Sequence, residues 1–408
     1  MIKNFFKKNF LMNYTFFLII SLFSFSCSQD KNYNAEIKGN TMGTYYFIEV
    51  IEVPIELKIK KLELEIKDTL TKVNKILSNW DAESEISIIN KIDKTTAIKI
   101  SDELNELFKT ANEINTKSNG FFDLTIDPII ELWGFGYKNK QTQVIPTNEQ
   151  IENALSLIGQ NSFLKTNFDN NELIKKNRNL KINLSSIGKG YGIDLIGKKL
   201  DQLGINNYII NIGGDILTKG HNSKKENWVI GIENPNLKEK LIKEIVNITN
   251  KGLATSGDYK NFFTKNGYKY SHIINPKTGK PVTHSTRSVT VIHESSMKAD
   301  GWATAFLVLG SLEGLKIAEK EKIAVLFIDE IDDKLIVFKS NTFKKIKKDN
   351  NWDFKKIIVG IVMDIFIFAF LFFLIITLIM SLGVMLMKKN IKGSCGGLNA
   401  ISGSDKCS

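Results

Sequence analysis

The chain has 408 residues, enough for one large globular domain with additional segments. Its formal net charge is +11, but residues 1–30 carry +2 and residues 341–408 carry +6, which leaves +3 for the centre. Because the charged ends flank apolar stretches, the charge is typical of segments at a membrane surface, and we exclude nucleic-acid binding.

The first residues have the pattern of a secretory signal. Three lysines within the first eight residues precede an apolar stretch over 16–25, which is too short to span a membrane comfortably. Cys27 follows this stretch, so we expect 1–27 to be a signal peptide that ends at a bacterial lipoprotein cysteine, acylated at Cys27 after cleavage. The alternative is an uncleaved anchor in which the cysteine is incidental.

The centre of the chain, residues 28–343, predicts an α+β domain. Strand patterns that are mostly adjacent, with helical patterns interspersed but not strictly alternating, favour a mixed or antiparallel sheet over a doubly wound one. Ser101 followed by two acidic residues is typical of a helix start. The expected helices cover 55–77, 101–117, 149–158, 190–203 and 299–319, and the expected strands 45–53, 180–184, 208–212, 228–232, 244–249, 268–274, 288–293 and 323–328.

The C-terminal part is expected to leave the globular domain. A Lys-rich linker over 344–356 precedes an apolar segment over 357–387, in which Asp364 is the single charge. A helix needs about 20 apolar residues to cross a bilayer, so this segment predicts a transmembrane helix. If the signal exports the central domain, the protein lies in the bacterial inner membrane, with the domain on the periplasmic face and the tail over 388–408 in the cytoplasm.

Cys395 and Cys407 lie in the Gly/Ser-rich tail, and no cysteine lies in the central domain. Disulfides therefore do not hold that domain together. Two thiols in a reducing compartment suit a transient iron contact. Gly-Ser-Cys-Gly-Gly-Leu-Asn at 393–399 and Ser-Asp-Lys-Cys at 404–407 resemble NqrM, a maturation factor of the Na⁺-translocating NADH:quinone reductase, which implies a part in iron delivery. The alternative is a membrane anchor with incidental thiols.

A candidate metal site lies at the start of the expected helix 299–319. Asp300 and Thr304 are four residues apart, so they would share one helix face, one turn apart. A carboxylate and a hydroxyl offer hard oxygen ligands, which suit Mg²⁺ better than a softer metal. The helix N-terminus would also direct N–H groups at phosphate oxygens. The alternative is an N-cap Asp and a Thr bonded back to its own helix.

Seven further motifs accompany this pair. In order and spacing, over roughly residues 36–340, they resemble the FAD:protein FMN transferases, the ApbE family of flavin-attaching enzymes. They are Thr-Met-Gly-Thr at 41–44, Ser-Asn-Trp-Asp at 78–81 with Ser-Glu-Ile-Ser at 84–87, Gly-Phe-Phe-Asp-Leu-Thr at 120–125 running to Leu-Trp-Gly-Phe at 132–135, Asn-Leu-Ser-Ser-Ile-Gly-Lys-Gly-Tyr at 183–191 with Asp194, Asn-Ile-Gly-Gly-Asp at 211–215, Ala-Thr-Ser-Gly-Asp-Tyr at 254–259 and Ser-His-Ile-Ile-Asn-Pro-Lys-Thr-Gly at 271–279.

The resemblance implies Mg²⁺-dependent transfer of FMN from FAD to a threonine of an acceptor protein, with AMP as the leaving group. It implies acceptors among the flavin-carrying subunits of respiratory complexes, and the tail points to the Na⁺-translocating NADH:quinone reductase. The metal would be held by Asp300, Thr304 and a backbone oxygen of the Ser185–Ser186 turn, with Ala303 where relatives can carry a second acidic residue. The flavin contacts would come from Met42, Trp80, Phe121, Phe122, Asp123, Asn183, Lys189 and Ile274.

His272 and Lys189 are, with Asp300, the candidate catalytic residues. Imidazole can carry a proton or contact a phosphate near neutral pH, and a lysine supplies a point charge to a phosphate. The alternatives are a structural histidine in a strand and a solvated lysine after a turn. Asp215 and Asp258 each follow a glycine, so a turn-stabilising role is their default and they are second-tier candidates.

Two other functions stay open at the level of sequence. One is a non-catalytic lipoprotein that holds FAD in the same pocket. The other is an FAD pyrophosphatase that releases FMN and AMP, which needs the same metal but no acceptor protein.

Overall fold

The computed structural model describes residues 32–93, 95–136, 145–235, 242–259, 261–348, 363 and 365–379. The chain divides into two compact units, Met1–Asn350 and Asn351–Ser408. The expected signal peptide with Cys27 lies outside the described residues, as do Cys395 and Cys407.

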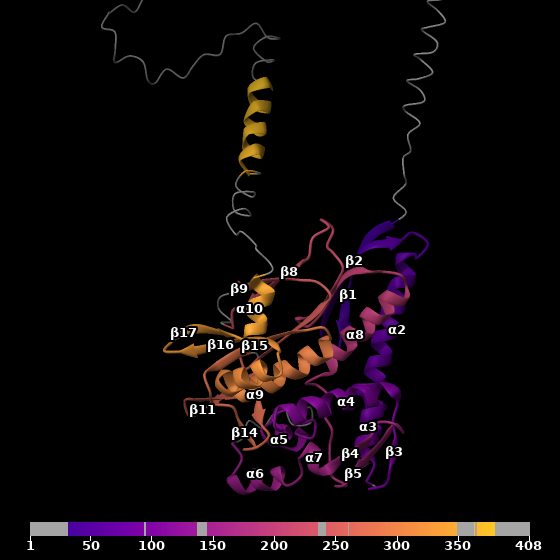
Figure 1. The fold of residues 1–408 in the computed structure, drawn as a ribbon, viewed down its shortest axis with the longest axis vertical. Helices are drawn as coiled ribbons and strands as arrows, with labels where there is room; N and C mark the ends of the chain where they lie inside the picture. Colours follow the sequence, from indigo (N-terminus) through magenta and orange to yellow (C-terminus); the bar gives the residue numbers. More distant parts are fainter. Residues whose placement is uncertain are drawn as a thin grey trace, which may run out of the picture. The chain divides into compact units, whose positions relative to one another are not determined.

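An eight-stranded antiparallel sheet runs through the first unit (Figure 1). β16 begins with a continuous apolar run of five residues, and β15 is buried along almost its whole length, because the sheet is covered on both faces where they lie. Along β16, Val325 and Phe327 point to one core and Leu326 and Ile328 to the other. In spatial order the strands are β1 (Asn32–Thr41), β2 (Thr44–Pro54), β6 (Asn207–Ile212), β7 (Asp215–Lys219), β10 (Lys251–Gly257), β15 (Thr286–His293), β16 (Ala324–Ile331) and β17 (Lys334–Lys339).

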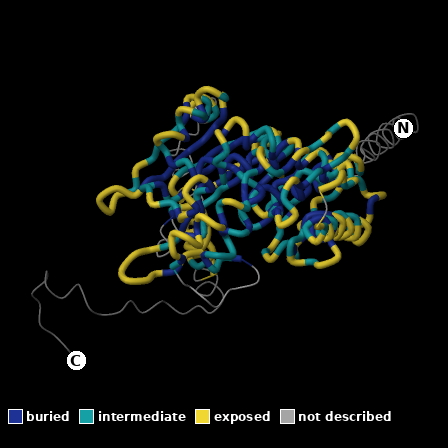
Figure 2. Tube along the Cα trace, turned by 90° about the horizontal axis from the view of Figure 1, so that it is seen from below, coloured by how far each residue is buried: buried dark blue, intermediate teal, exposed yellow. Residues whose placement is uncertain are grey.

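Helices cover one face of this sheet, and a hairpin and a short helix cover the other. Figure 2 shows buried residues through the middle of the unit and exposed ones at its periphery. On the second face, Trp228 and Phe343 are buried against the strands. The helical layer consists of α2 (Ile59–Leu77), α4 (Asp102–Lys117), α8 (Gly188–Gln202) and α9 (Ser296–Lys320), and the opposite layer of β8 (Trp228–Glu233), β9 (Ile242–Ile248) and α10 (Asn341–Lys348).

Shorter elements complete the unit. Ile129, Trp133, Ile151 and Phe263 form part of a small apolar cluster apart from the main cores. The elements are α3 (Glu85–Lys91), β3 (Ile98–Lys99), α5 (Asp127–Leu132), α6 (Asn148–Leu155), α7 (Gln160–Phe163), β4 (Leu164–Asn167), β5 (Glu172–Lys175), β11 (Phe262–Lys265), β12 (Tyr268–Ser271), β13 (Ile274–Asn275) and β14 (Lys280–Pro281).

α9 bends at Gly310, which adopts φ 76° within the helix. The N–H of the next residue, Ser311, donates to Thr286 Oγ1 at 2.9 Å instead of continuing the helical ladder. A Cβ atom at Gly310 would lie 2.9 Å from the ring of His284, so glycine is required here both for its backbone and for its size.

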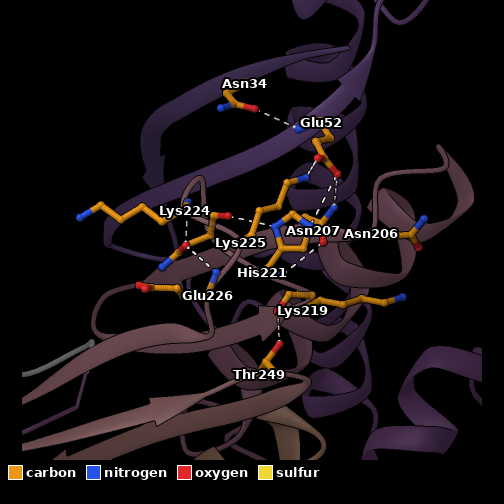
Figure 3. A network of polar contacts seen from close by, with 12 residues as sticks. Asn34, Glu52, Asn206, Asn207, Lys219, His221, Lys224, Lys225, Glu226 and Thr249 are labelled. Atoms are coloured by element: carbon orange, nitrogen blue, oxygen red, sulfur yellow. Dashed lines mark hydrogen bonds and ion pairs between the residues drawn. The ribbon is translucent and has the colours of Figure 1, made fainter. Parts of the chain in front are cut away.

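A bulge in β2 organises the loop that leads to β8 (Figure 3). Glu52 adopts φ 61° at the bulge, and its backbone N–H donates to Asn34 Oδ1 at 3.0 Å. Its carboxylate accepts from Asn207 Nδ2 at 3.0 Å and pairs with Lys225, while His221 Nε2 lies 3.7 Å away. These contacts fix the loop to the sheet.

The sequence predicted the long elements, but the strand expected over 180–184 is wrong. This segment is extended without a strand partner, because asparagine side chains take the place of a neighbouring strand. Asn79 and Asn90 both donate to the carbonyl of Ile182, at 2.8 and 2.9 Å, and the N–H of Ile182 donates back to Asn90 Oδ1 at 2.8 Å. The expected strand over 268–274 is divided into β12 and β13.

The predicted transmembrane helix over 357–387 is also wrong. Within the residues that the structure describes, no helix is long and apolar enough to cross a membrane. The helical run over 365–379 would rise about 22 Å at 1.5 Å per residue, which is less than the roughly 30 Å of a hydrocarbon core. The predicted inner-membrane location, with a periplasmic domain and a cytoplasmic tail, depended on that helix and is corrected with it. Apart from Met363, the remainder of 357–387 lies outside the described residues.

Candidate active site

Two cavities adjoin in the first unit, between the starts of α8 and α9 and the end of β10. The first has a volume of about 370 Å³ and the second about 320 Å³. The residues that line both are Ile130, Asn183, Ser185, Lys189 and His272.

The start of α8 makes unusually close contact with α9. The side chain of the N-cap residue Ile187 makes no capping bond, and the N–H of Gly190 donates to Asp300 Oδ2 at 3.0 Å. A Cβ atom at Gly190 would lie 2.2 Å from the carbonyl oxygen of Ser296, so the helices meet backbone to backbone. Since a helix N-terminus carries partial positive charge, it stabilises the Asp300 carboxylate.

The start of α9 is capped in turn by α8. Asp194 accepts from Ser295 Oγ at 2.6 Å and from the N–H groups of Ser296 and Met297 at 2.8 and 3.0 Å. Ser295 is the N-cap residue of α9 and accepts from the N–H of Lys298 at 3.2 Å. Each helix therefore supplies an aspartate to the N-terminus of the other, which fixes their relative position.

Lys189 lies between two buried carboxylates. Its Nζ forms an ion pair with Asp215 Oδ2 and lies 3.5 Å from Asp300 Oδ1. Asp215 and Asp300 are 1% and 3% exposed. Burial acts to lower the pKa of Lys189, but the two carboxylates outweigh it and raise that pKa above its ordinary value. Burial also raises the pKa of Asp215, and the Lys189 ammonium offsets only part of this rise.

Three residues that can offer oxygen ligands to a metal, Ser186, Asp300 and Thr304, line the second cavity. Thr304 Oγ1 donates to the carbonyl oxygen of Ser186 at 3.4 Å and is 3.4 Å from Ser256 Oγ, while Asp300 lines the same cavity. One carboxylate, a carbonyl and a hydroxyl suit Mg²⁺, which usually takes its other ligands from water and phosphate. Within the described ranges no three His, Cys, Asp or Glu side chains group as a metal site. The sequence also allowed Asp300 to be the N-cap residue of α9. The N-cap residue is Ser295, so Asp300 does not have that role.

His272 lies at the junction of the cavities with one ring nitrogen already engaged. Its Nδ1 is 2.9 Å from the carbonyl oxygen of Asn261, so Nδ1 carries the proton and Nε2 is left as the basic nitrogen. Burial lowers the pKa of His272, and the hydrogen bond to Asn261 opposes this only in part. The imidazole is therefore neutral near pH 7, the state required of a general base.

The predicted flavin contacts divide between the two cavities. Met42 and Trp80 line the first, and Asn183 and Lys189 line both. The Trp80 side chain is prominent at the surface, since the residue is 69% exposed. Those lining the second cavity alone are Phe121, Phe122, Asp123 and Ile274.

Two of these predicted contacts are strongly held by the protein itself. Asp123 Oδ1 accepts from Thr125 and its Oδ2 from the N–H of Gln160 at 3.0 Å. Asn183 Nδ2 donates to Asp127 Oδ1 at 2.8 Å. Both side chains are thus fixed in orientation at the cavity wall, and their roles toward flavin stay predictions.

Sequence reasoning missed several residues of the site. Ser256 lies in a recognised motif, but nothing in its local spacing indicates that it faces Thr304. Asn261, which orients His272, follows the Gly-Asp-Tyr motif at 257–259, and Ile130 belongs to an apolar run that reads as ordinary core. A sequence motif identifies a functional segment, but which residues of two distant segments come into contact depends on the tertiary fold.

The first unit is an α+β domain, and its adjoining cavities combine a lysine, a histidine with one basic ring nitrogen and hard oxygen atoms, a set typical of enzyme active sites. The comparisons agree with this class. The chain belongs to the ApbE family, whose family model matches residues 42–327. A second family model, described as (Na⁺)-NQR maturation NqrM, matches residues 384–408. Both family resemblances noted in the sequence are thereby confirmed.

Similar proteins and structures carry flavin transferase names. The FAD:protein FMN transferase of Buchnera aphidicola subsp. Schizaphis graminum is 36% identical over 83% of this chain and 98% of its own length. That of Vibrio cholerae serotype O1 is 36% identical over 76% of this chain and 91% of its own. The structure of the flavin transferase ApbE from Vibrio cholerae aligns with a TM-score of 0.71 at 35% identity, covering 77% of this chain and 99% of the other. The apo form of the Pseudomonas stutzeri flavinyl transferase ApbE gives 0.70 at 30% identity, covering 77% and 97%.

Proposed function

We propose that this chain is an FAD:protein FMN transferase that joins FMN through a phosphoester bond to a threonine of an acceptor protein. The observation that carries the proposal is the position of Lys189 and His272 at the junction of two adjoining cavities. FAD has two halves joined by a pyrophosphate, so the pyrophosphate would lie at this junction. The names of the relatives support the same reaction.

The reaction balances with groups at the junction. The acceptor threonine oxygen attacks the phosphorus of the FMN phosphate, and the bond from that phosphorus to the bridging oxygen breaks, so AMP leaves with the bridging oxygen. His272 Nε2 accepts the hydroxyl proton of the threonine. Lys189 supplies positive charge to the pyrophosphate as negative charge shifts to the leaving oxygen.

We further propose Mg²⁺ as the cofactor, held by Asp300, Thr304 and the carbonyl oxygen of Ser186. When bound, it would neutralise charge on the phosphate oxygens. The hydrogen bond between Thr304 Oγ1 and the carbonyl oxygen of Ser186, and the burial of Asp300 at the wall of the same cavity, support this set.

FAD would be held at the walls of both cavities, with the isoalloxazine in the first. The indole of Trp80 can stack on the isoalloxazine, and Met42 offers an adaptable apolar surface beside it. Asn183 is held by Asp127 and offers an oriented amide. Phe121, Phe122, Asp123 and Ile274 would contact the part of FAD in the second cavity.

The acceptors would be flavin-carrying subunits of the Na⁺-translocating NADH:quinone reductase type. The match of residues 384–408 to the NqrM family supports this assignment. By the same resemblance, Cys395 and Cys407 would contact iron during maturation of the same client.

The test incubates the full chain with FAD, Mg²⁺ and a candidate acceptor subunit, then measures flavin fluorescence of the denatured acceptor in a gel. Covalent fluorescence that is lost when the acceptor threonine is changed to alanine supports transfer. Release of FMN and AMP at the same rate without acceptor would indicate a pyrophosphatase. Intact FAD after long incubation with an acceptor that a related transferase modifies would indicate a binding protein.

A further inference from the structure

Asp215 is a buried carboxylate beside the candidate active site that lines neither of its two cavities. It follows the turn at Gly213 and Gly214 and is 1% exposed. Its Oδ1 accepts from the N–H of Thr255 at 3.2 Å, and its Oδ2 accepts from Lys189 Nζ. Asp215 therefore acts on the site through Lys189 and not by touching a ligand in these cavities.

Lys189 is shared unequally between two carboxylates. Its ammonium lies closer to Asp215 than to Asp300, where the separation is 3.5 Å. Asp300 Oδ2 is also bonded by the N–H of Gly190, so Oδ1 is the oxygen that faces the ammonium. A cation at Asp300 and the ammonium would compete for the same oxygen.

We propose that Asp215 is a positioning residue, which draws the Lys189 ammonium away from Asp300 and leaves the Asp300 carboxylate open to a divalent cation. The inference rests on the proposed function, which assigns that cation to Asp300. The two aspartates and the lysine together carry a net charge of −1, which favours a divalent ion. Without the charge of Asp215, the ammonium would pair with Asp300 alone and repel the cation.

The test measures Mn²⁺ binding, as a probe for Mg²⁺, by electron paramagnetic resonance of free Mn²⁺ in titrations of the full chain. Asp215→Asn is expected to weaken binding about tenfold or more, since like charges a few ångströms apart repel strongly in a buried site. The double variant Asp215→Asn with Lys189→Met is expected to bind several-fold more tightly than Asp215→Asn alone, because the competing ammonium is gone. A merely structural role of Asp215 would give no such recovery.

Controls separate the outcomes. Asp201→Asn changes an exposed aspartate on α8, the helix that carries Lys189, and should leave Mn²⁺ affinity unchanged. Asp215→Glu keeps the charge and should retain affinity even if Asp215→Asn does not fold; a tenfold loss in Asp215→Glu would overturn the inference. Equal affinity of wild type and Asp215→Asn, or no recovery in the double variant, would also overturn it. If the wild type itself binds no Mn²⁺, the proposed metal site fails and this inference with it.

Discussion

Asp194→Ala should destabilise the domain by about 3 kcal/mol. The substitution removes the acceptor for one hydroxyl and two backbone N–H groups at the start of α9. With about 1 kcal/mol for each hydrogen bond, which is typical of a lost N-cap, the three sum to this value. The N-cap bond that Ser295 accepts from Lys298 remains, so α9 should persist with a loosened first turn.

Urea denaturation of the full chain, followed by tryptophan fluorescence, measures this effect. Trp302 lies in α9 and is 3% exposed, so its emission reports on the affected helix. Asp201→Ala is the matched control on α8, because Asp201 is exposed and accepts from Tyr208 and Lys219; we expect a loss below about 1 kcal/mol. A loss below 1 kcal/mol for Asp194→Ala, or equal losses for both variants, would refute the capping argument.

Three further predictions follow from the structure. Asp300→Ala should abolish Mg²⁺-dependent turnover in the flavin-transfer assay, while circular dichroism shows that the domain stays folded. Thr304→Ala should lower activity less, because water can replace a neutral hydroxyl ligand. Near-full activity of Asp300→Ala would exclude the proposed metal site. Burial lowers the pKa of Lys175 to about 8, and its Nζ donates to the carbonyl of Ile89 at 3.0 Å. The pKa of Lys175 is lower in the folded than in the unfolded state. The free energy of unfolding of the wild type should therefore rise by up to about 3 kcal/mol relative to that of Lys175→Met as the pH increases from 8 to 10.5. Parallel plots of unfolding free energy against pH for the two proteins would contradict this. Gly310→Ala should cost about 2 kcal/mol, measured by denaturation, because the backbone there suits glycine alone; an unchanged midpoint would show that the bend in α9 relaxes freely.

Local patterns were sufficient for the elements that bury an amphipathic face. The helix that begins after Ser101 has the expected boundary, since Ser101 accepts from the N–H of Leu104 at 3.2 Å. The segment over 180–184 has the same apolar character as a strand, yet its partners are the side chains of Asn79 and Asn90, about one hundred residues earlier in the chain. No local spacing encodes such a partner.

In the site, too, residue pairs close in sequence could be predicted, whereas contacts between distant residues could not. Asp300 and Thr304 could be paired from their spacing, and both line one cavity. Asp215 read as a turn residue because it follows two glycines, but its partner Lys189 lies 26 positions before it and Asp300 lies 85 positions after it. Likewise, the hydrogen bond that His272 Nδ1 donates to the carbonyl oxygen of Asn261, which leaves Nε2 basic, depends on how two loops meet.

The mutual capping of α8 and α9 has a consequence for turnover. Any rotation or slide of one helix against the other would break hydrogen bonds at both N-termini at once, because Asp194 and Asp300 each belong to the opposite helix. The lysine and the aspartate of the site are therefore aligned when the domain folds, before any ligand arrives. Such pre-alignment reduces the reorganisation that a reaction must drive, and it leaves the entry of the acceptor and the departure of the nucleotide as the steps in which motion is needed.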